Sequence, residues 1–125
     1  MRVEHHLQAA QRIARSLEKC GPNDWEMKIE AAMLAGTHWL NATLHSLEAT
    51  DAGKDVMHSY LLTVNEFRRL CVADSEAMRA LAEIEEMRPP FVRGNWPGAE
   101  RAAERALALL QTIRNRSEVA CRAFG

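Results

Sequence analysis

The segment WEMKIEAAMLAGTHWLNATLHSLEA, residues 25–49, decides the fold of this chain of 125 residues. Apolar side chains recur along it at steps of three and four, which places them on one face of an α-helix. A second face carries small residues, so we expect a central helix that touches neighbours on two sides. Its main stripe comprises Ile29, Met33, Gly36, Leu40, Leu44 and Leu47, and its second face Ala31, Ala35 and Ala42 with Trp39 nearby.

A glycine inside this helix indicates close packing. Glycine is about 1 kcal/mol less favourable than alanine in a helix interior. The presence of Gly36 therefore predicts that a neighbouring helix approaches the backbone there. Asn23 or Asp24 is the expected cap at the start of the helix, because both side chains can accept a hydrogen bond from the first turn.

Helical spacing also recurs on both sides of the central segment and predicts four further helices. The residues expected to face inward are Val3, Leu7, Ala10, Ala14 and Leu17 in the first; Val56, Tyr60, Val64, Phe67 and Leu70 in the third; Met78, Leu81 and Ala82 in a short acidic fourth over 75–88; and Ala102, Ala106, Leu109, Ile113, Ala120 and Phe124 in the last, over 99–123.

Turn signals separate these segments. Gly21 and Pro22 end the first helix, the stretch 50–53 forms a turn, and Asp74 precedes the short helix. Pro89 ends that helix, since a proline disfavours helical geometry in the residue before it. The stretch 91–98 is expected to be an ordered loop with Phe91, Val92 and Trp96 as apolar anchors. The sequence therefore predicts an all-α single domain over 1–125, an antiparallel up-and-down four-helix bundle with one additional short helix.

Composition excludes several classes of protein. The formal net charge is −1 and 47% of the residues are hydrophobic, as in an ordinary globular domain. No stretch approaches the roughly 18 apolar residues that a membrane span requires, and no apolar run near Met1 suggests a secretory signal. Cys20, Cys71 and Cys121 are too few and too scattered for a disulfide framework. We expect a cytoplasmic protein with reduced thiols and no membrane partner.

The histidines of the central segment suggest a ligand site. His38 and His45 are seven residues apart and share a helix face, with Glu30 and Asn41 on or near it. One interpretation is a polar ligand site between helices, and the other is a solvated edge of the helix. His45 also loosely resembles the phospho-accepting residue of a histidine phosphotransfer helix. Glu48 stands where that motif has a lysine, and it would repel a phosphoryl group.

Metal and catalytic motifs are missing from the sequence. A di-iron bundle needs Glu-x-x-His on two helices, and the nearest case is Asp55-x-x-His58. No two histidines are spaced i, i+4. Glu83-x-x-Glu86 fits half of the magnesium motif of helical pyrophosphohydrolases, but no aspartate follows Asp74 to complete it. The sequence therefore predicts no catalytic residue, no metal and no cofactor.

Arginines gather toward the end of the chain. Arg101, Arg105 and Arg116 fall within about 60° of one another around a helical wheel, and Arg93 in the preceding loop could join them. Such a strip can bind the phosphates of RNA or of a nucleotide. The alternative interpretation is a solvated face with ion pairs within the helix.

The order of the expected helices, with Arg93-x-Asn95 before an Ala- and Arg-rich last helix, resembles the HEPN class of small helical domains. The resemblance implies a homodimer that acts on RNA or accompanies a nucleotidyltransferase. Ribonuclease members of this class carry a motif of three residues: an arginine, a polar residue and then a histidine. Arg93 and Asn95 match the first two residues of this motif, and the histidine is missing. No histidine follows His58, so the resemblance implies loss of cleavage.

Three hypotheses follow from the sequence. The first is a non-catalytic cytoplasmic bundle that acts as a homodimer or as an interaction module for a protein partner. The second is RNA or nucleotide binding along the arginine strip, with Asn95. The third is a small-ligand or phosphotransfer site formed by Glu30, His38, Asn41 and His45.

Overall fold

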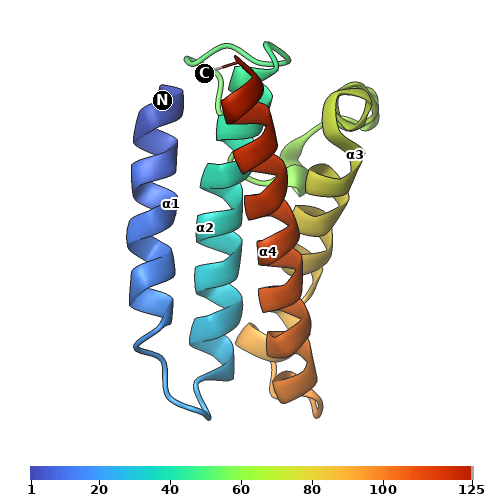
Figure 1. Cartoon of the computed structure of the whole chain (residues 1–125). Helices are drawn as coiled ribbons and strands as arrows, with labels where there is room; N and C mark the ends of the chain where they lie inside the picture. Colours follow the sequence, from blue (N-terminus) through green and yellow to red (C-terminus); the bar gives the residue numbers. More distant parts are fainter. Residues whose placement is uncertain (125) are drawn as a thin grey trace.

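The chain forms an antiparallel helical bundle in a computed structural model that describes residues 1–124, with side chains described for 1–122. Successive long helices run in opposite directions along one axis, which confirms the predicted all-α up-and-down architecture with a short extra helix (Figure 1). No strand occurs among the described residues. The elements are α1 (Val3–Leu17), α2 (Trp25–Ser46), η1 (Ser59–Leu61), α3 (Val64–Glu86), η2 (Pro89–Arg93) and α4 (Ala99–Phe124).

Helix α2 is the central element, as its apolar faces predict. It packs against α1, α3 and α4, and its side chains are buried on nearly all sides from Ile29 onward. A Cβ built on Gly36 would lie 3.1 Å from Cδ1 of Ile113 in α4 and 3.6 Å from Cδ1 of Leu81 in α3. The glycine therefore lies where two helices approach α2 most closely, which confirms the expected close packing.

Helix α2 ends three residues earlier than the sequence suggests. Glu48 adopts the left-handed conformation, with φ of 60°. The N–H of Glu48 donates to the carbonyl of His45, and the N–H of Ala49 donates to that of Leu44. This pair of bonds is a Schellman motif, whose left-handed position is usually occupied by glycine. The motif turns the chain back over the end of the bundle and begins the loop that leads to η1.

Replacing Glu48 with glycine should stabilise the protein. The left-handed conformation is about 1 kcal/mol less favourable for a residue with a Cβ atom, and the exposed Glu48 forms no ion pair with any side chain that the structure describes. We expect Glu48→Gly to raise the free energy of unfolding by about 1 kcal/mol in urea titrations. The matched control is Glu18→Gly at the end of α1, where φ is −61°. That change should lower stability, and a loss of stability in Glu48→Gly would contradict the argument.

The predicted third helix is wrong in its first half. Residues 54–63 form a loop and the short η1, and the α-helix begins only at Val64. Thr63 starts it with a capping box: its hydroxyl accepts a hydrogen bond from the N–H of Glu66, whose carboxylate accepts one from the N–H of Thr63. Val56 and Leu70 are buried as expected, whereas Tyr60 and Val64 are exposed. Phe67 is half-buried.

The predicted break at Asp74 is present as a kink inside α3. Asp74 has non-helical φ and ψ of −155° and 96°, and its Oδ1 accepts a hydrogen bond from the N–H of Ala77. The carboxylate thus caps the second half of α3. That half is a full member of the bundle rather than an accessory helix, because Met78, Leu81 and Ile84 are completely buried. The first half turns away from the bundle axis (Figure 1).

The connection from α3 to α4 is more regular than the predicted loop. Pro89 lies just beyond the end of α3, as expected, but residues 89–93 form a single π-helical turn, η2. Phe91 and Val92 pack against the core, whereas Trp96 is exposed, so only two of the three predicted anchors are in place. The side chain expected inward at Phe124 lies outside the side chains that the structure describes.

Two remaining observations concern the environment of the chain. None of the described helices combines the length and the apolar character that a membrane crossing requires. All three cysteines are free and partly buried.

Candidate functional site

The loop between α2 and η1 is fixed to α2 by one buried amide. Asn41 Oδ1 accepts a hydrogen bond of 2.7 Å from the N–H of Val56, and Asn41 Nδ2 donates one of 2.8 Å to the carbonyl of the same residue. The same Nδ2 also donates to the carbonyl of Thr37 one turn earlier in α2. Val56 is buried beneath the loop. This clamp determines where the residues on either side of Val56 lie.

Removing the amide should destabilise the protein strongly. Asn41→Leu keeps similar volume but leaves the buried N–H and C=O of Val56 without partners. Each such group costs about 1–3 kcal/mol, so we expect the free energy of unfolding to fall by about 2–4 kcal/mol. Urea unfolding followed by circular dichroism measures the change. The control Asn115→Leu removes only an exposed bond to Gln111 and should change stability little. Equal stability of the two variants would refute the clamp.

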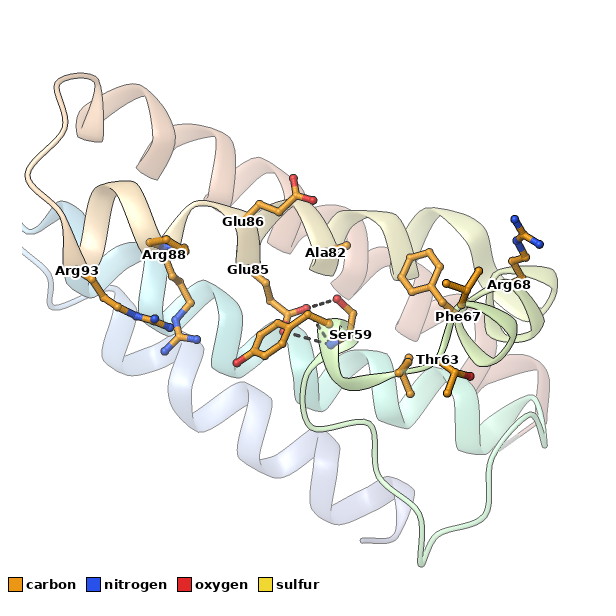
Figure 2. Close-up of a pocket in the computed structure, with 13 residues that line it drawn as sticks. Ser59, Thr63, Phe67, Arg68, Ala82, Glu85, Glu86, Arg88 and Arg93 are labelled. Carbon is orange, nitrogen blue, oxygen red and sulfur yellow. Dashed lines mark hydrogen bonds between the residues drawn. The ribbon is translucent and has the colours of Figure 1, made fainter.

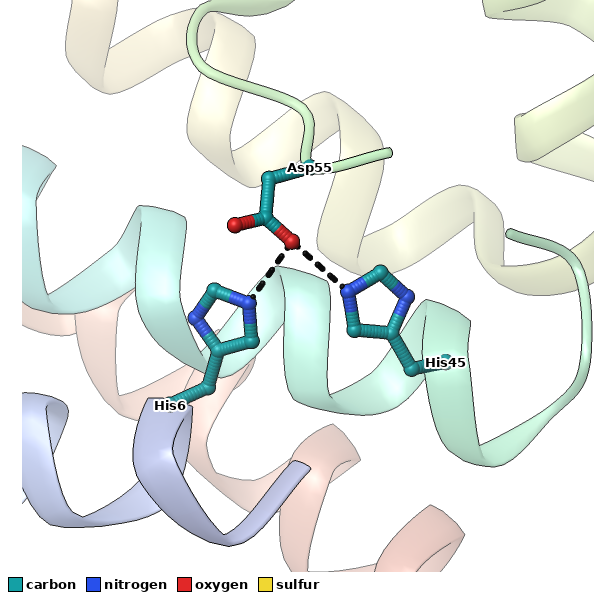
Figure 3. Close-up of side chains that lie close together, drawn as sticks. All are labelled: His6, His45 and Asp55. Atoms are coloured by element: carbon teal, nitrogen blue, oxygen red, sulfur yellow. Dashed lines mark hydrogen bonds and ion pairs between the residues drawn. The ribbon is translucent and has the colours of Figure 1, made fainter. Parts of the chain in front are cut away.

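Asp55, next to the clamp, lies between two histidines from different helices. Its Oδ1 lies 2.9 Å from Nε2 of His6 in α1 and 2.8 Å from Nε2 of His45 in the last turn of α2 (Figure 3). The side chains of His6 and His45 are only 2% and 3% exposed, and that of Asp55 is 22% exposed. The three groups form a buried polar cluster at the end of the bundle where α1 begins.

The other ring nitrogens of both histidines also have partners. His6 Nδ1 lies 2.9 Å from Nδ1 of His38, and His45 Nδ1 lies 2.6 Å from the hydroxyl oxygen of Thr50. With neutral rings, His38 donates to His6, Thr50 donates to His45, and both Nε2–H groups donate to Asp55. Every group in this chain of hydrogen bonds is then satisfied.

The electrostatics around the cluster favour neutral rings at His6 and His38 and an ionised carboxylate at Asp55. Burial disfavours the charged form of Asp55, but hydrogen bonds from His45, His6 and the amino group of Met1 outweigh it and lower its pKa to about 2. Burial lowers the pKa of His6 despite its bond to Asp55, and burial together with the neighbouring His6 lowers the pKa of His38. Asp55 is therefore a partly buried negative charge at neutral pH.

A second candidate site is a cleft between η1, α3 and η2 (Figure 2). Its volume is about 800 Å³, and much of its wall is apolar. Leu62, Val64, Phe67, Ala82 and Pro89 supply the apolar wall, and the ring of Tyr60 stacks on that of His58, with centroids 4.8 Å apart. The cleft exists because α3 bends at Asp74 and its first half stands away from the bundle.

A buried carboxylate forms part of the floor of this cleft. Glu85 accepts hydrogen bonds from the N–H and the hydroxyl of Ser59 and lies 3.0 Å from Nδ1 of His58. These donors come from the segment that follows the Asn41 clamp. The contacts anchor η1 on α3 and occupy both carboxylate oxygens of Glu85.

Guanidinium groups lie at both ends of the cleft. Arg88 and Arg93 are at one end and Arg68 at the other (Figure 2). Arg88 donates a hydrogen bond of 2.7 Å to Glu30, and that bond raises its pKa. Arg68 and Arg93 form no ion pair among the described residues. The cleft therefore combines apolar walls with cationic ends.

The structure separates the four residues of the expected helix-2 ligand site. His38 and His45 belong to one cluster, but His6 joins them, and they do not contact each other directly. Asn41 clamps the neighbouring loop. Glu30 lies elsewhere and pairs with Arg88. The buried His45 has both ring nitrogens engaged, which does not fit the exposed phospho-accepting histidine of a phosphotransfer helix, so that alternative is set aside.

The predicted arginine strip is not continuous. Arg105 forms a two-pronged ion pair with Glu83, and Arg116 donates to the kink residue Asp74. Arg101 and Asn95 are exposed and form no side-chain hydrogen bond among the described residues, and Arg93 alone of this set lines the cleft. The ion pairs of Arg105 and Arg116 run from α4 to α3, whereas Arg114, outside the strip, pairs with Glu118 within α4.

Sequence analysis missed His6, Asp55 and Glu85. The histidine search considered pairs on one helix, whereas His6 and Asp55 are 49 residues apart in the sequence. The available signal was a histidine near the start of α1 and an aspartate after the turn at 50–53, both near the same end of the bundle. Nothing in the local sequence identified Glu85 among its acidic neighbours.

The chain was also compared with models of known protein families, with curated proteins and with solved structures, and no match was found. The HEPN-like layout therefore stays a prediction.

Proposed function

We propose that the protein binds a small amphipathic anion, an apolar or aromatic body with one carboxylate, sulfonate or phosphate group. The observation that carries this proposal is the cleft of about 800 Å³ with apolar walls and arginines at both ends. Sites for small organic molecules have volumes of this order, mostly apolar linings and a few polar groups that fix orientation.

The charges around the cleft support an anion rather than a cation. Glu85 is the buried acid of the lining, and Ser59 and His58 already satisfy it. Glu86 is exposed, and Glu30 offsets only the charge of Arg88. Arg68 and Arg93 remain as cations that can pair with a ligand, and a guanidinium matches the geometry of a carboxylate or phosphate.

The proposed binding function agrees with the expected non-catalytic role. It also limits the expected RNA or nucleotide ligand to a compact molecule. Arg93 is the one residue of the predicted RNA-binding set that lines the cleft, so a compact nucleotide-sized anion fits better than a long RNA strand. The three free thiols support the expected cytoplasmic location, where cysteines stay reduced.

A fluorescent probe tests the cleft directly. We expect 8-anilinonaphthalene-1-sulfonate, an aromatic body with one sulfonate, to bind one site with a Kd of about 10 µM, and decanoate to displace it. The single sulfonate can pair with the guanidinium at only one end of the cleft, so one of Arg93→Gln and Arg68→Gln should weaken binding about tenfold by removing a charged hydrogen bond, and the other should change it little. Ala82→Phe should abolish binding by filling the cleft.

The control Arg101→Gln removes an exposed arginine of α4 outside the cleft and should leave the affinity unchanged. Near-ultraviolet dichroism confirms that each variant is folded, because the probe also binds partly unfolded chains. Unchanged affinity in a folded Ala82→Phe protein would remove the cleft as the binding site.

The exposed apolar surface beside the cleft supports the second candidate function, a homodimer. Tyr60 and Leu61 in η1 and Val64 at the start of α3 are each at least 60% exposed, and Val72 in α3 is 89% exposed. Large apolar side chains exposed together mark surfaces that associate. We propose that two copies pair through this part of η1 and α3, as the HEPN-like layout also implies.

Sedimentation equilibrium at micromolar concentration tests the dimer. We expect about twice the chain mass of 14.1 kDa, and Leu61→Glu should return the protein to a monomer because it buries a charge in the interface. The control Val119→Glu replaces an exposed apolar residue of α4, which is 52% exposed, and should leave the dimer intact. A wild-type monomer at these concentrations contradicts the proposal.

A further inference from the structure

Two imidazole nitrogens and one carboxylate oxygen converge at the end of the bundle. His6 Nε2, His45 Nε2 and Asp55 Oδ1 all lie within 4.8 Å of one another, the single such group among the described residues. From this convergence we propose that the three side chains bind one divalent transition-metal ion, Zn²⁺ being the expected occupant. None of the three lines the anion-binding cleft, so this proposal is independent of the proposed function.

The directions of the side chains fit ligands around a common centre. Both rings point their Nε2 atoms at the same oxygen of Asp55, while Oδ2 faces away from the two rings (Figure 3). Two ligand atoms about 2.1 Å from a metal lie about 3.0 Å apart at a right angle and about 3.4 Å apart at the tetrahedral angle. The observed separations of 2.9 and 2.8 Å are close to the right-angle value, and Asp55 would move away from the rings so that the ion lies on the axes of both Nε2 atoms.

The second ring nitrogens already have the partners that metal-binding histidines require. A histidine that binds zinc through one nitrogen usually donates a hydrogen bond from the other, which fixes the ring. His6 Nδ1 faces Nδ1 of His38, and His45 Nδ1 faces the hydroxyl of Thr50. With a metal on both Nε2 atoms, these two bonds reverse direction, so that His38 and Thr50 accept hydrogen bonds from Nδ1 of the two ligand rings without a change of their rotamers.

The types of the donor atoms select the class of metal. Imidazole nitrogens suit zinc and its neighbours in the first transition row, whereas Ca²⁺ and Mg²⁺ take oxygen ligands. Two histidines with one carboxylate form the three-ligand set of zinc sites that keep a fourth position for water or another ligand. A cavity of about 220 Å³, lined in part by His6, His38 and Asp55, lies against the cluster and gives an ion a path of entry.

The charge at the cluster also favours a cation. The carboxylate of Asp55 attracts one cationic group already, since the amino group of Met1 lies 3.2 Å from Oδ1. No arginine or lysine forms an ion pair with Asp55 among the described residues. A divalent ion between the three ligands would replace the amino group at this oxygen. Its charge of +2 would compensate the negative charge of Asp55 more fully than the single charge of the amino group.

Metal titration of the whole chain, purified without a histidine tag and treated with a chelator, tests the site. Calorimetry should show one Zn²⁺ per chain with a submicromolar Kd, and Co²⁺ should give the visible absorption of a low-symmetry site. Asp55→Asn and His6→Gln should each weaken Zn²⁺ binding about 100-fold. His5→Gln changes the adjacent, exposed histidine and should leave the affinity unchanged.

Three further variants examine the positioning residues and the thiols. His38→Phe and Thr50→Ala leave the ligands in place and should weaken Zn²⁺ binding about tenfold. Replacing all three cysteines with serine should not change the affinity, since the thiols lie outside the cluster. Binding that is lost with the cysteines, or kept in folded Asp55→Asn and His6→Gln proteins, would overturn the assignment.

A measurement on the unchanged protein guards against variants that fail to fold. Nitrogen-15 spectra of the imidazoles should show His6 and His45 protonated at Nε2 without metal and at Nδ1 after one equivalent of Zn²⁺. The reversal follows from the paired hydrogen bonds around each ring. Rings that keep a proton on Nε2 at saturating Zn²⁺, or no zinc binding at millimolar concentration, would show a hydrogen-bonded cluster and not a metal site.

Discussion

The backbone of Val56 is held to α2 by a pair of hydrogen bonds with the Asn41 amide, and both candidate sites depend on this contact. The residue before the clamp, Asp55, reaches the histidines of α1 and α2. The residues after it, His58 and Ser59, bind Glu85 and set the wall of the cleft. A loop without such an anchor would place neither set of side chains, because connecting segments are the most variable part of a bundle.

Helix α2 is largely apolar, yet it buries several polar side chains at this end of the bundle. Burying an unpaired polar group is costly, and here each has a partner: no described buried side-chain nitrogen or oxygen is left without a hydrogen bond. Satisfied networks of this kind fix one geometry, since every member depends on its neighbours. The ordered donors around Asp55 are therefore compatible with a site that keeps its shape before any ligand arrives.

The kink of α3 at Asp74 creates the second candidate site, the cleft. Oδ1 of Asp74 caps the second half of α3, and Oδ2 accepts a hydrogen bond from Arg116 of α4. One buried carboxylate thus interrupts the helix and joins it to its neighbour. The first half of α3 leaves the bundle, and the space that it leaves against η1 and η2 is the cleft. A straight helix over the same residues would have continued the bundle and provided no such space.

Sequence periodicity determined the helices and their order, because burial of an apolar stripe depends on spacing within about twenty residues. The sequence also predicted the close helix packing at Gly36 and the break at Asp74. It failed over 54–63, where the four-residue spacing of Val56, Tyr60 and Val64 imitates a helix, whereas the capping box at Thr63 starts α3 later. Only the tertiary structure brought His6 and His45 to Asp55 and paired Glu30 with Arg88. These contacts depend on how a returning loop meets two helix ends, and no local pattern of side chains encodes that distance.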